Sequence, residues 1–546
     1  MKFLNKLKAA FTPGPKFLAQ AIIIAAATTS TISTWYYYTH GQLNLAIGDA
    51  LSRLDISRKL IDNIQPGFAQ LGNIWLPLPQ LLMLPFIWSS WLWHTGIAGA
   101  LMSGTAFTVA VYFLFRIGRD IFDSRLSGVV MAAIALLSHN LVYIQTTAMS
   151  ETLFISLIIT SMYYLLRWAK TNRDNDLIPA AIFVSLSTLT RFEAYFFAAG
   201  ALLLVGILSL MRTKSFKKLE GRTIMFATLA LTGIGVWMLY LGIIFGDPLY
   251  WMHIYQHTTS IVSTDVQAKK ELVTQTSHVA QYHNLGASAW SYAEATGFMN
   301  GLLLTGLAVI SMLVVLLMLF RRKYRNSYLP MLLLPLSIFI FMIYTLFNNG
   351  IPLELPALSW TNLWNTNLSA MHEYNIRYGL IMFPAIVLFV GWIASRQKIF
   401  GALAIALTAA QLYYLPISSP ALTYSLPIQM SIHRSGLTHD ETAAADYIKS
   451  HYDGQPIMIS ALTHDPVMFY MGIDYKHFIH EGAGKAWIQA RTDPSINAKW
   501  IYMNAIPSEE QTSDSVTKYL LGSQILDKKY TEVFKSPTVL VYERKN

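Results

Sequence analysis

Long runs of apolar residues, separated by short polar segments, occupy roughly the first three quarters of this chain. Most of the runs are about 17 to 25 residues long, which lets one helix cross about 30 Å of hydrocarbon. Because a soluble fold has no need for so many runs of this length, the pattern predicts an all-α multi-pass membrane protein with about eleven transmembrane helices. The expected spans are residues 17–38, 96–116, 127–145, 152–168, 177–190, 194–211, 223–245, 297–320, 328–347, 377–395 and 399–416.

A different pattern begins after residue 416. A helical stretch at residues 440–451 is followed by short runs typical of strands. These β-like runs are residues 456–461, 499–504 and 538–542. We therefore expect two domains, a transmembrane catalytic domain over residues 1–416 and a small α/β accessory domain over residues 417–546.

The charged residues indicate how the chain is oriented. Only 13% of the residues are charged, against roughly 25% in soluble domains. The net charge of +10 does not indicate a nucleic-acid partner, because the basic residues mostly flank the apolar runs. With a cytoplasmic N-terminus, every short inner loop is basic. These loops carry Arg116, Arg119, Arg125, Arg167, Lys170, Arg173, Arg212, Lys214, Lys217, Lys218, Arg222, Arg321, Arg322, Lys323, Arg325, Arg396 and Lys398.

The positive-inside rule therefore predicts a protein of the cell membrane with a cytoplasmic N-terminus and an extracytoplasmic C-terminal domain. All the long connections then lie outside, at residues 39–95, 246–296 and 348–376, together with the tail. We expect the working surface on that face. The chain has no cysteine, which excludes a disulfide framework and a thiolate metal site.

The outer segment at residues 48–85 carries charge, Pro and Trp where a short polar turn would be enough to connect two spans. A helix starting near Asp49 places Arg53 one turn further on, so a carboxylate and a guanidinium share one face. Pro66 and Gly67 break this helix, and a Trp75-Leu-Pro-Leu-Pro stretch returns the chain to an apolar surface. The alternative is an ordered loop whose charges are simply solvated.

Further ionisable residues occur at or near the outer ends of the expected spans. They are Glu151, Arg191, Glu193, Asp247 and Arg377, the last followed by Tyr378. Such groups are costly near the bilayer unless they pair with one another or line a wet cavity. Taken singly they have simpler explanations: Asp247 ends a helix before a proline, and Glu193 pairs with Arg191 or caps a helix. Their shared location on one membrane face favours a functional site.

Carboxylates and arginines in one membrane-edge cavity suit a lipid-linked phosphate. A carboxylate can take a proton from an attacking hydroxyl, and a guanidinium can hold a phosphate with two hydrogen bonds. We expect at least one arginine to contact the donor phosphate, with Arg58 and Arg377 ahead of Arg53 and Arg191. Most outer Trp residues fit an interfacial belt, although a few could stack on a sugar ring.

These short motifs resemble the C-type (GT-C) membrane glycosyltransferases that use polyprenyl-phosphate sugars, near the protein O-mannosyltransferase and aminoarabinose-transferase branch. The resemblance covers residues 17–416 and rests on Gly48-Asp49-Ala50, Trp75 to Pro79, Met149-Ser150-Glu151, Leu189 to Glu193, Gly246-Asp247-Pro248 and Asn375 to Tyr378. It implies that Asp49 is the catalytic base and that Glu151 assists.

Within this resemblance, Glu193, Trp75 and Tyr378 are expected to contact or support the substrate. The family often has two adjacent acidic residues in the first loop, and Gly48 replaces the first of them here. A divalent cation is therefore possible but not indicated by the sequence, and no other cofactor is expected. The Trp-Trp-Asp-Tyr-Gly pattern of oligosaccharyltransferases is absent, which disfavours en bloc glycan transfer.

The expected function is transfer of a sugar from a polyprenyl-phosphate-linked donor to an acceptor hydroxyl at the outer face, by a single inverting displacement. The acceptor could be a protein, a lipid or a glycan. The alternative is a polyprenyl-lipid or glycolipid transporter or flippase. Secondary transporters tend to show internal repeats and midplane sites. This chain shows no internal repeat, and its ionisable residues gather at the outer edge, so transfer is favoured.

Overall fold

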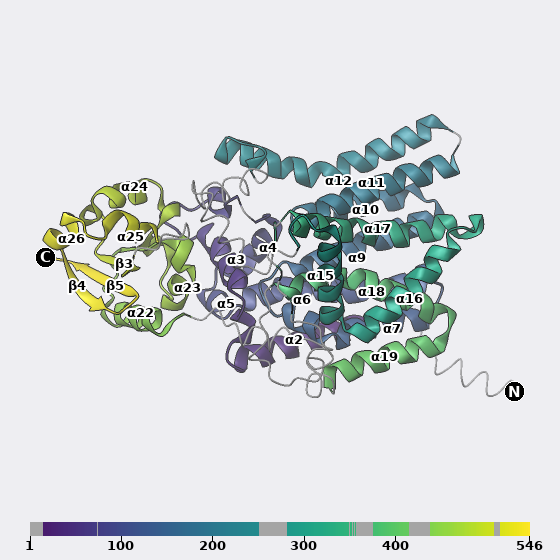
Figure 1. The fold of residues 1–546 in the computed structure, drawn as a ribbon, viewed down its shortest axis with the longest axis horizontal. Coiled ribbons are helices and arrows are strands. Elements are labelled where there is room, and N and C mark those ends of the chain that lie inside the picture. The colour runs from purple at the N-terminus through teal and green to yellow at the C-terminus, as the bar shows by residue number, and fades with distance from the viewer. Residues whose placement is uncertain are drawn as a thin grey trace.

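The computed structural model describes residues 15–250 except 74 and 214, residues 281–355 except 349, 352 and 354, and residues 375–413, 437–506 and 514–545. Helices form the larger part, and a small domain that contains a β-sheet lies at one end (Figure 1). The predicted fold class, a helical multi-pass membrane protein with a small C-terminal α/β domain, is confirmed. The expected boundary at residues 416 and 417 lies outside the described residues.

Among the described residues, seven helices are long and apolar enough to cross a membrane, or eight if one bent pair counts as a single span. The long helices are α2 (Pro15–Thr39), α6 (Ile97–Arg116), α9 (Glu151–Thr171), α11 (Glu193–Arg212), α12 (Phe216–Phe245), α17 (Arg322–Phe347) and α18 (Phe383–Arg396), which continues the 3-10 helix η8 (Ile376–Met382). Shorter helices occupy three more predicted spans, namely α7 (Arg125–Leu137), α10 (Leu177–Thr188) and α19 (Lys398–Tyr413).

Two expected spans are broken. The expected span at 297–320 falls on two helices, α15 (Leu285–Asn300) and α16 (Leu302–Met318), which meet at an angle of 118°. Gly301 lies at this bend with a φ of +87°, a backbone conformation that glycine adopts without strain. The expected span at 127–145 is also divided, because α7 ends before Ser138 and a separate helix, α8 (His139–Ile144), follows.

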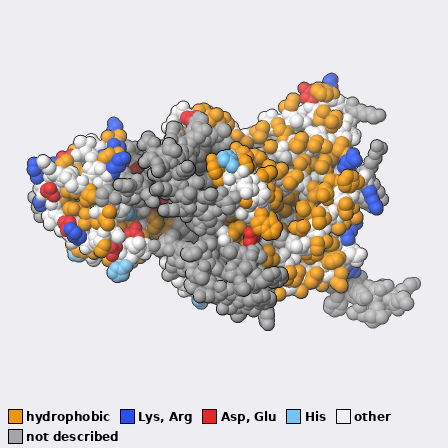
Figure 2. Space-filling model, in the orientation of Figure 1, with side chains coloured by type: hydrophobic (Ala, Val, Ile, Leu, Met, Phe, Trp, Pro, Cys, Tyr) orange, Lys and Arg blue, Asp and Glu red, His pale blue; other side chains and the backbone are white. Residues whose placement is uncertain are grey.

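The centre of the membrane part is formed by α9 and by η8 with α18. In each of these two segments, 89% of the most apolar stretch of 18 residues is buried inside the protein, whereas the corresponding share is 17% in α2 and 22% in α12. α9 packs between α6 and α10, and η8 packs on α15. The outer surface of the helical part is largely apolar (Figure 2), as expected where lipid chains surround a protein.

A group of short helices lies between the membrane part and the C-terminal domain (Figure 1). They are η1 (Leu43–Leu45), α3 (Gly48–Lys59), η2 (Phe68–Leu71), α4 (Leu78–Ile87) and α5 (Ser90–His94). α3 packs on α4 within this group, on α6 of the membrane part and on α23 of the C-terminal domain. This helix therefore contacts both parts of the molecule.

The C-terminal domain is a five-stranded mixed sheet with the order β2-β1-β3-β5-β4, flanked by helices. β1 is parallel to β2 and β3, while β5 is antiparallel to β3 and β4. The elements are α22 (His439–His451), β1 (Ile457–Met458), α23 (Ala461–Met471), η10 (Tyr475–His477), β2 (Phe478–Ile479), α24 (Lys485–Thr492), β3 (Trp500–Asn504), α25 (Ser515–Leu520), α26 (Gln524–Lys529), β4 (Tyr530–Lys535) and β5 (Val539–Arg544).

The predicted helix at 440–451 and the three predicted strand runs correspond to α22, β1, β3 and β5. The pattern missed β2 because it has only two residues, and it missed β4 because most of that strand is exposed or half-buried.

Candidate functional site

Three carboxylates from distant parts of the sequence occupy equivalent positions, in the first turns of three helices. Asp49 lies in the first turn of α3, Glu151 opens α9, and Glu193 opens α11. The positive end of a helix dipole stabilises a carboxylate at this position. The simplest role of each carboxylate is therefore to complete a helix terminus, and a catalytic role needs further evidence from their surroundings.

The turn before Glu151 is held tightly against α6. Ser103 on α6 donates a hydrogen bond to the backbone carbonyl of Thr147 at 2.8 Å, and also lies 3.3 Å from that of Met149. Gly99, one turn earlier on α6, packs so closely on Ala148 that a Cβ at position 99 would overlap it. The start of α9, and with it Glu151, is therefore fixed relative to α6.

Arg377 is positioned by η8, which approaches α15 at backbone contact distance. A Cβ on Gly379 would overlap the backbone of Ala295, so this approach requires glycine. Asn300 donates a hydrogen bond to the carbonyl of Gly379 at 2.9 Å. Arg377 is consequently fixed by a junction between helices that are far apart in sequence.

The arginines and carboxylates form one connected network. Arg377 forms an ion pair with Asp49, and its Nε lies 3.4 Å from Oε1 of Glu151. Arg191 contacts the same Glu151 oxygen at 3.1 Å through Nη1 and binds Glu193 at 2.7 Å through Nη2. Glu151 therefore lies between two guanidinium groups and links them.

Asp49 differs from the other two carboxylates in its exposure. The Asp49 side chain is 43% exposed, whereas the side chain of Glu151 is fully buried and that of Glu193 is 4% exposed. A base that takes a proton from a substrate must be reachable. Of the three, Asp49 is the carboxylate that a substrate can reach, and the buried pair is suited to holding the arginines.

Arg53 is a buried cation of this site with unsatisfied hydrogen-bond donors. It follows Asp49 by one turn of α3 and is 6% exposed. Its guanidinium carbon lies 4.5 Å from the centre of the Trp75 ring, but within the described part of the chain no atom accepts a hydrogen bond from Nε or Nη1. Burial lowers the pKa of Arg53 to about 10, although the charges of Glu151 and Asp49 oppose this effect.

Tyr378 lies beside both network arginines. Its ring centre is 5.1 Å from the guanidinium carbon of Arg191 and 5.5 Å from that of Arg377. Two contacting residues were missed by the sequence analysis. Ser150 accepts a hydrogen bond from Arg191 at 3.1 Å, and the Tyr292 hydroxyl donates to the carbonyl of Tyr378 at 3.3 Å. Ser150 could have been chosen because it is a polar residue next to Glu151, whereas nothing in the sequence singled out Tyr292.

Arg58 lies away from this network. Its Nε binds Asp62 at 2.9 Å, one Nη binds Asp474 of the C-terminal domain at 3.1 Å, and the other binds the carbonyls of Ile87 and Trp88. The structure thus brings together Asp49, Arg53, Trp75, Glu151, Arg191, Glu193, Arg377 and Tyr378, but not Arg58.

Asp247 lies just after Gly246, which ends α12 in the left-handed conformation at φ +75°, and it accepts a hydrogen bond from the Leu249 amide at 2.9 Å. This geometry fits the expected helix stop. Among the residues that the structure describes, no group of three or more His, Asp or Glu side chains is arranged to hold a metal ion.

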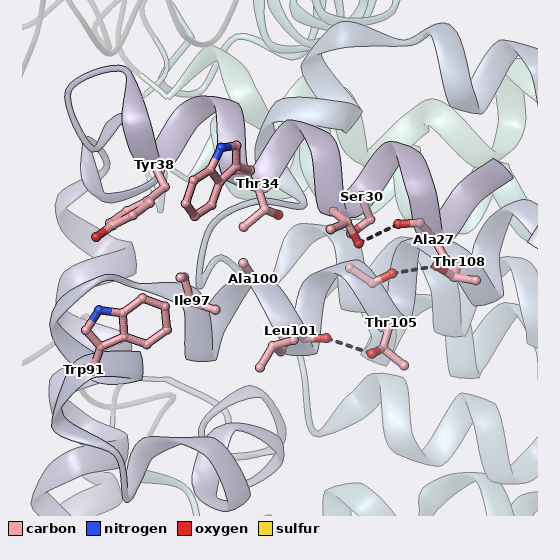
Figure 3. Close-up of a pocket in the computed structure, with 13 residues that line it drawn as sticks. Ala27, Ser30, Thr34, Tyr38, Trp91, Ile97, Ala100, Leu101, Thr105 and Thr108 are labelled. Atoms are coloured by element: carbon pink, nitrogen blue, oxygen red, sulfur yellow. Dashed lines mark hydrogen bonds between the residues drawn. The ribbon is translucent and has the colours of Figure 1, made fainter. Parts of the chain in front are cut away.

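A separate groove of about 350 Å³ runs between α2 and α6 (Figure 3). Small and hydroxyl-bearing residues such as Ala27, Ser30 and Gly104 line it, with Trp35 and Trp91 among its aromatic residues. None of the network residues lines this groove, so it is distinct from the charged site.

Comparisons with known proteins agree with the resemblance seen in the motifs. Residues 92–244, from the end of α5 to α12, match the family model described as dolichyl-phosphate-mannose-protein mannosyltransferase. The resemblance to this class of membrane glycosyltransferase is therefore confirmed for that segment, which contains Glu151, Arg191 and Glu193. No curated protein matches the chain in sequence.

Solved structures that can be superposed on this chain have low sequence identity to it. The structure of ArnT from Cupriavidus metallidurans bound to undecaprenyl phosphate is 11% identical, with a TM-score of 0.49, and the match covers 97% of this chain and 98% of that one. The archaeal oligosaccharyltransferase AglB from Archaeoglobus fulgidus, in complex with an inhibitory peptide and a dolichol-phosphate, is 10% identical with a TM-score of 0.45, covering 90% and 69% of the two chains.

Proposed function

We propose that this protein transfers a sugar from a polyprenyl-phosphate donor to a hydroxyl group of an acceptor, with Asp49 as the base. One observation carries the proposal: the accessible carboxylate of Asp49 lies one helical turn from Arg53, a buried cation whose Nε and Nη1 have no hydrogen-bond acceptor among the described residues. A buried guanidinium group with unsatisfied donors costs stability unless a ligand uses them. A lipid-linked phosphate supplies the missing acceptor oxygens together with further negative charge.

In the proposed reaction the acceptor hydroxyl attacks the anomeric carbon while Asp49 takes its proton. The new bond joins the acceptor oxygen to the anomeric carbon, and the bond from that carbon to the phosphate oxygen breaks. The phosphate leaves with the electron pair and needs no proton. Arg53 and Arg377 stabilise its developing charge. A single displacement of this kind inverts the configuration at the anomeric carbon.

Glu151 has a positioning role in this scheme. It is buried between Arg377 and Arg191, so its charge holds both guanidinium groups in place. Arg191 is already bound by Glu151 and Glu193, which makes it a weaker candidate for the phosphate than Arg53. We propose a structural role for Arg58 because its donors are engaged by Asp62 and by the C-terminal domain. No step is assigned to a metal ion.

The proposed orientation places the site outside the cytoplasm, with the N-terminus inside the cell. Lys and Arg side chains gather at the end of the helical part that is remote from the C-terminal domain (Figure 2), which supports a cytoplasmic location for that end. The bound undecaprenyl phosphate of ArnT and the bound dolichol-phosphate of AglB support a lipid-linked donor. The peptide bound to AglB is consistent with a macromolecular acceptor.

The experiment is reconstitution of the purified protein in lipid vesicles with a panel of polyprenyl-phosphate sugars and hydroxyl-bearing acceptors. The proposal predicts release of polyprenyl phosphate together with an acceptor of increased mass, and formation of both products about 10²–10⁴-fold more slowly with Asp49→Asn. Movement of the intact donor across the bilayer, without cleavage of the sugar, would instead establish the transporter alternative.

A further inference from the structure

Helix α3 presents two different faces to its surroundings. Asp49 and Arg53 are four residues apart and share the face toward the charged site. A second stripe of charged residues lies toward the other side of the helix, because each residue advances the helix by about 100°. This stripe consists of Asp55, Arg58 and Lys59, and Asp62 continues it after the helix.

The second stripe binds the C-terminal domain through buried charges. Lys59 Nζ donates to Oδ1 of Asp465 on α23 at 2.8 Å, and the two side chains are only 10% and 13% exposed. The same ammonium lies 4.8 Å from the ring centre of Tyr475, whose hydroxyl is 3.5 Å from Asp465. This cluster joins α3 to two separate elements of the domain.

A second carboxylate, Asp55, is fully buried beside this cluster. It accepts a hydrogen bond from the indole of Trp93 at 3.0 Å. Burial and the neighbouring Asp465 raise the pKa of Asp55 well above its usual value, although Lys59 opposes the shift. Lys59 is therefore the ammonium group that both carboxylates face.

Hydrogen bonds on both sides of the cluster extend the contact. Asp62 accepts bonds from the backbone amides of Tyr475 and Lys476 at 3.2 and 3.3 Å. His480 lies 3.2 Å from Asn63, and Gln70 donates to the carbonyl of Gly482 at 2.9 Å. The C-terminal domain therefore contacts the C-terminal end of α3 and the segment after it at several points.

We infer that Lys59 and Asp465 are positioning residues for sugar transfer, because their buried ion pair holds α3 in the orientation that places Asp49 and Arg53 against Glu151 and Arg377. This inference rests on the proposed function for its catalytic consequence. The ten-residue separation between Asp49 and Lys59 corresponds to about 15 Å of helix. A rotation or tilt of α3 at its Lys59 end is therefore transmitted to the Asp49 end.

The first arm of the test does not depend on activity. Lys59→Met removes the ammonium group but keeps a side chain of similar length, and it should speed hydrogen exchange of the α3 amides by at least about tenfold. Lys59→Arg should retain the protection. The matched control is Lys499→Met, because Lys499 forms its ion pair with Asp453 at 2.6 Å, just before strand β3 and away from α3. Unchanged α3 exchange in Lys59→Met would overturn the inference.

The second arm is a double-mutant cycle in the reconstituted transfer reaction. Lys59→Met should lower kcat by at least about tenfold in the wild-type background and by a clearly smaller factor in Asp49→Asn, because the part of its effect that acts through Asp49 is already lost there. A variant that merely lowered the amount of folded protein would reduce turnover equally in both backgrounds, and that additive result would also overturn the inference. If the wild-type protein transfers no sugar while α3 still loosens in Lys59→Met, the proposed function fails and the domain contact stands.

Discussion

Asp49 and Arg377 lie 328 residues apart in the chain and form an ion pair at the centre of the charged site. Arg377 also approaches Glu151, so one guanidinium group joins an accessible carboxylate to a buried one. A ligand phosphate near Asp49 would compete with that carboxylate for Arg377. Binding of the donor would thus weaken the contact between Asp49 and Arg377 and free Asp49 to accept a proton.

The first prediction separates the two carboxylates. Asp49→Asn keeps the shape of the side chain but removes the base, and turnover should fall by about 10²–10⁴-fold, the usual contribution of general base catalysis. Glu151→Gln should cost less, because Glu151 acts through the arginines. Turnover of purified variants under saturating donor measures both effects.

A suitable control for these variants is Asp123→Asn. Asp123 pairs with Lys170 among the basic residues at the other end of the spans and is remote from the site in sequence and in contacts. It should retain wild-type turnover. Near wild-type turnover of Asp49→Asn together with an inactive Glu151→Gln would exchange the two roles.

The second prediction contrasts Arg53 with Arg191. Among the described residues no carboxylate forms an ion pair with Arg53, so Arg53→Met removes a buried charge whose Nε and Nη1 are unsatisfied and should raise the thermal stability of the unliganded protein. The same change should weaken donor binding by about 10- to 100-fold, since a charged hydrogen bond contributes about 1.5–3 kcal/mol. Arg191→Met should instead lower the free energy of unfolding by about 3–5 kcal/mol, because it removes the guanidinium group that binds the buried carboxylates of Glu151 and Glu193.

Thermal denaturation with and without polyprenyl phosphate measures both quantities on the same samples. The lipid phosphate should protect the wild-type protein and fail to protect Arg53→Met. Lower stability of unliganded Arg53→Met, with donor protection intact, would remove Arg53 from the phosphate site.

Part of this site could be predicted from the sequence, and helix geometry explains why Arg58 lies outside it. The four-residue spacing of Asp49 and Arg53 correctly placed both on one face of α3. The same geometry puts Arg58, nine residues from Asp49, about half a turn away on the opposite side, where it meets the C-terminal domain. The sequence analysis grouped Arg58 with the other arginines because of its charge and did not take this rotation into account.

Other relationships could not follow from one sequence. No local pattern connects Asp49 with Arg377, because their contact depends on how η8 packs against α15. The division of the expected span at 297–320 was likewise hidden, since a single glycine in an apolar run does not reveal a bend of 118°. The existence and order of the long helices, by contrast, followed directly from the length of the apolar runs.

The third prediction concerns pH and the C-terminal domain. Buried His464 lies 3.8 Å from Glu441 and 3.6 Å from Asp514. Burial lowers its pKa, but the two carboxylates outweigh burial and raise it above the usual value. A raised folded-state pKa means that protonation stabilises the fold. This stabilisation is complete below the unfolded-state pKa of about 6.5 and is lost as the pH rises through the folded-state value.

The contact with His464 lowers the pKa of Glu441, whose contribution is present above about pH 4.3 and is lost as the pH falls. The domain should therefore be most stable between about pH 4.5 and 6.5. Urea unfolding followed by tryptophan fluorescence measures this, because Trp487 and Trp500 are buried in the domain. In His464→Gln, the stability of the domain should decline less steeply above pH 6.5. An unchanged decline in that variant would show that other groups cause it.

The last prediction tests whether η8 positions Arg377. Gly379→Ala adds one methyl group where it meets the backbone of Ala295, so η8 must move away from α15 and carry Arg377 with it. A displacement of about 1 Å at a catalytic site can cost about 10²-fold in rate, and we expect a loss of turnover on that scale. Gly235→Ala is the matched control, because a Cβ on Gly235, within α12, meets nothing within 4 Å. That variant should keep wild-type turnover and gain roughly 0.5–1 kcal/mol of stability from the better helix former. Equal turnover of the two variants would show that the close contact of η8 with α15 is not what places Arg377 beside Asp49.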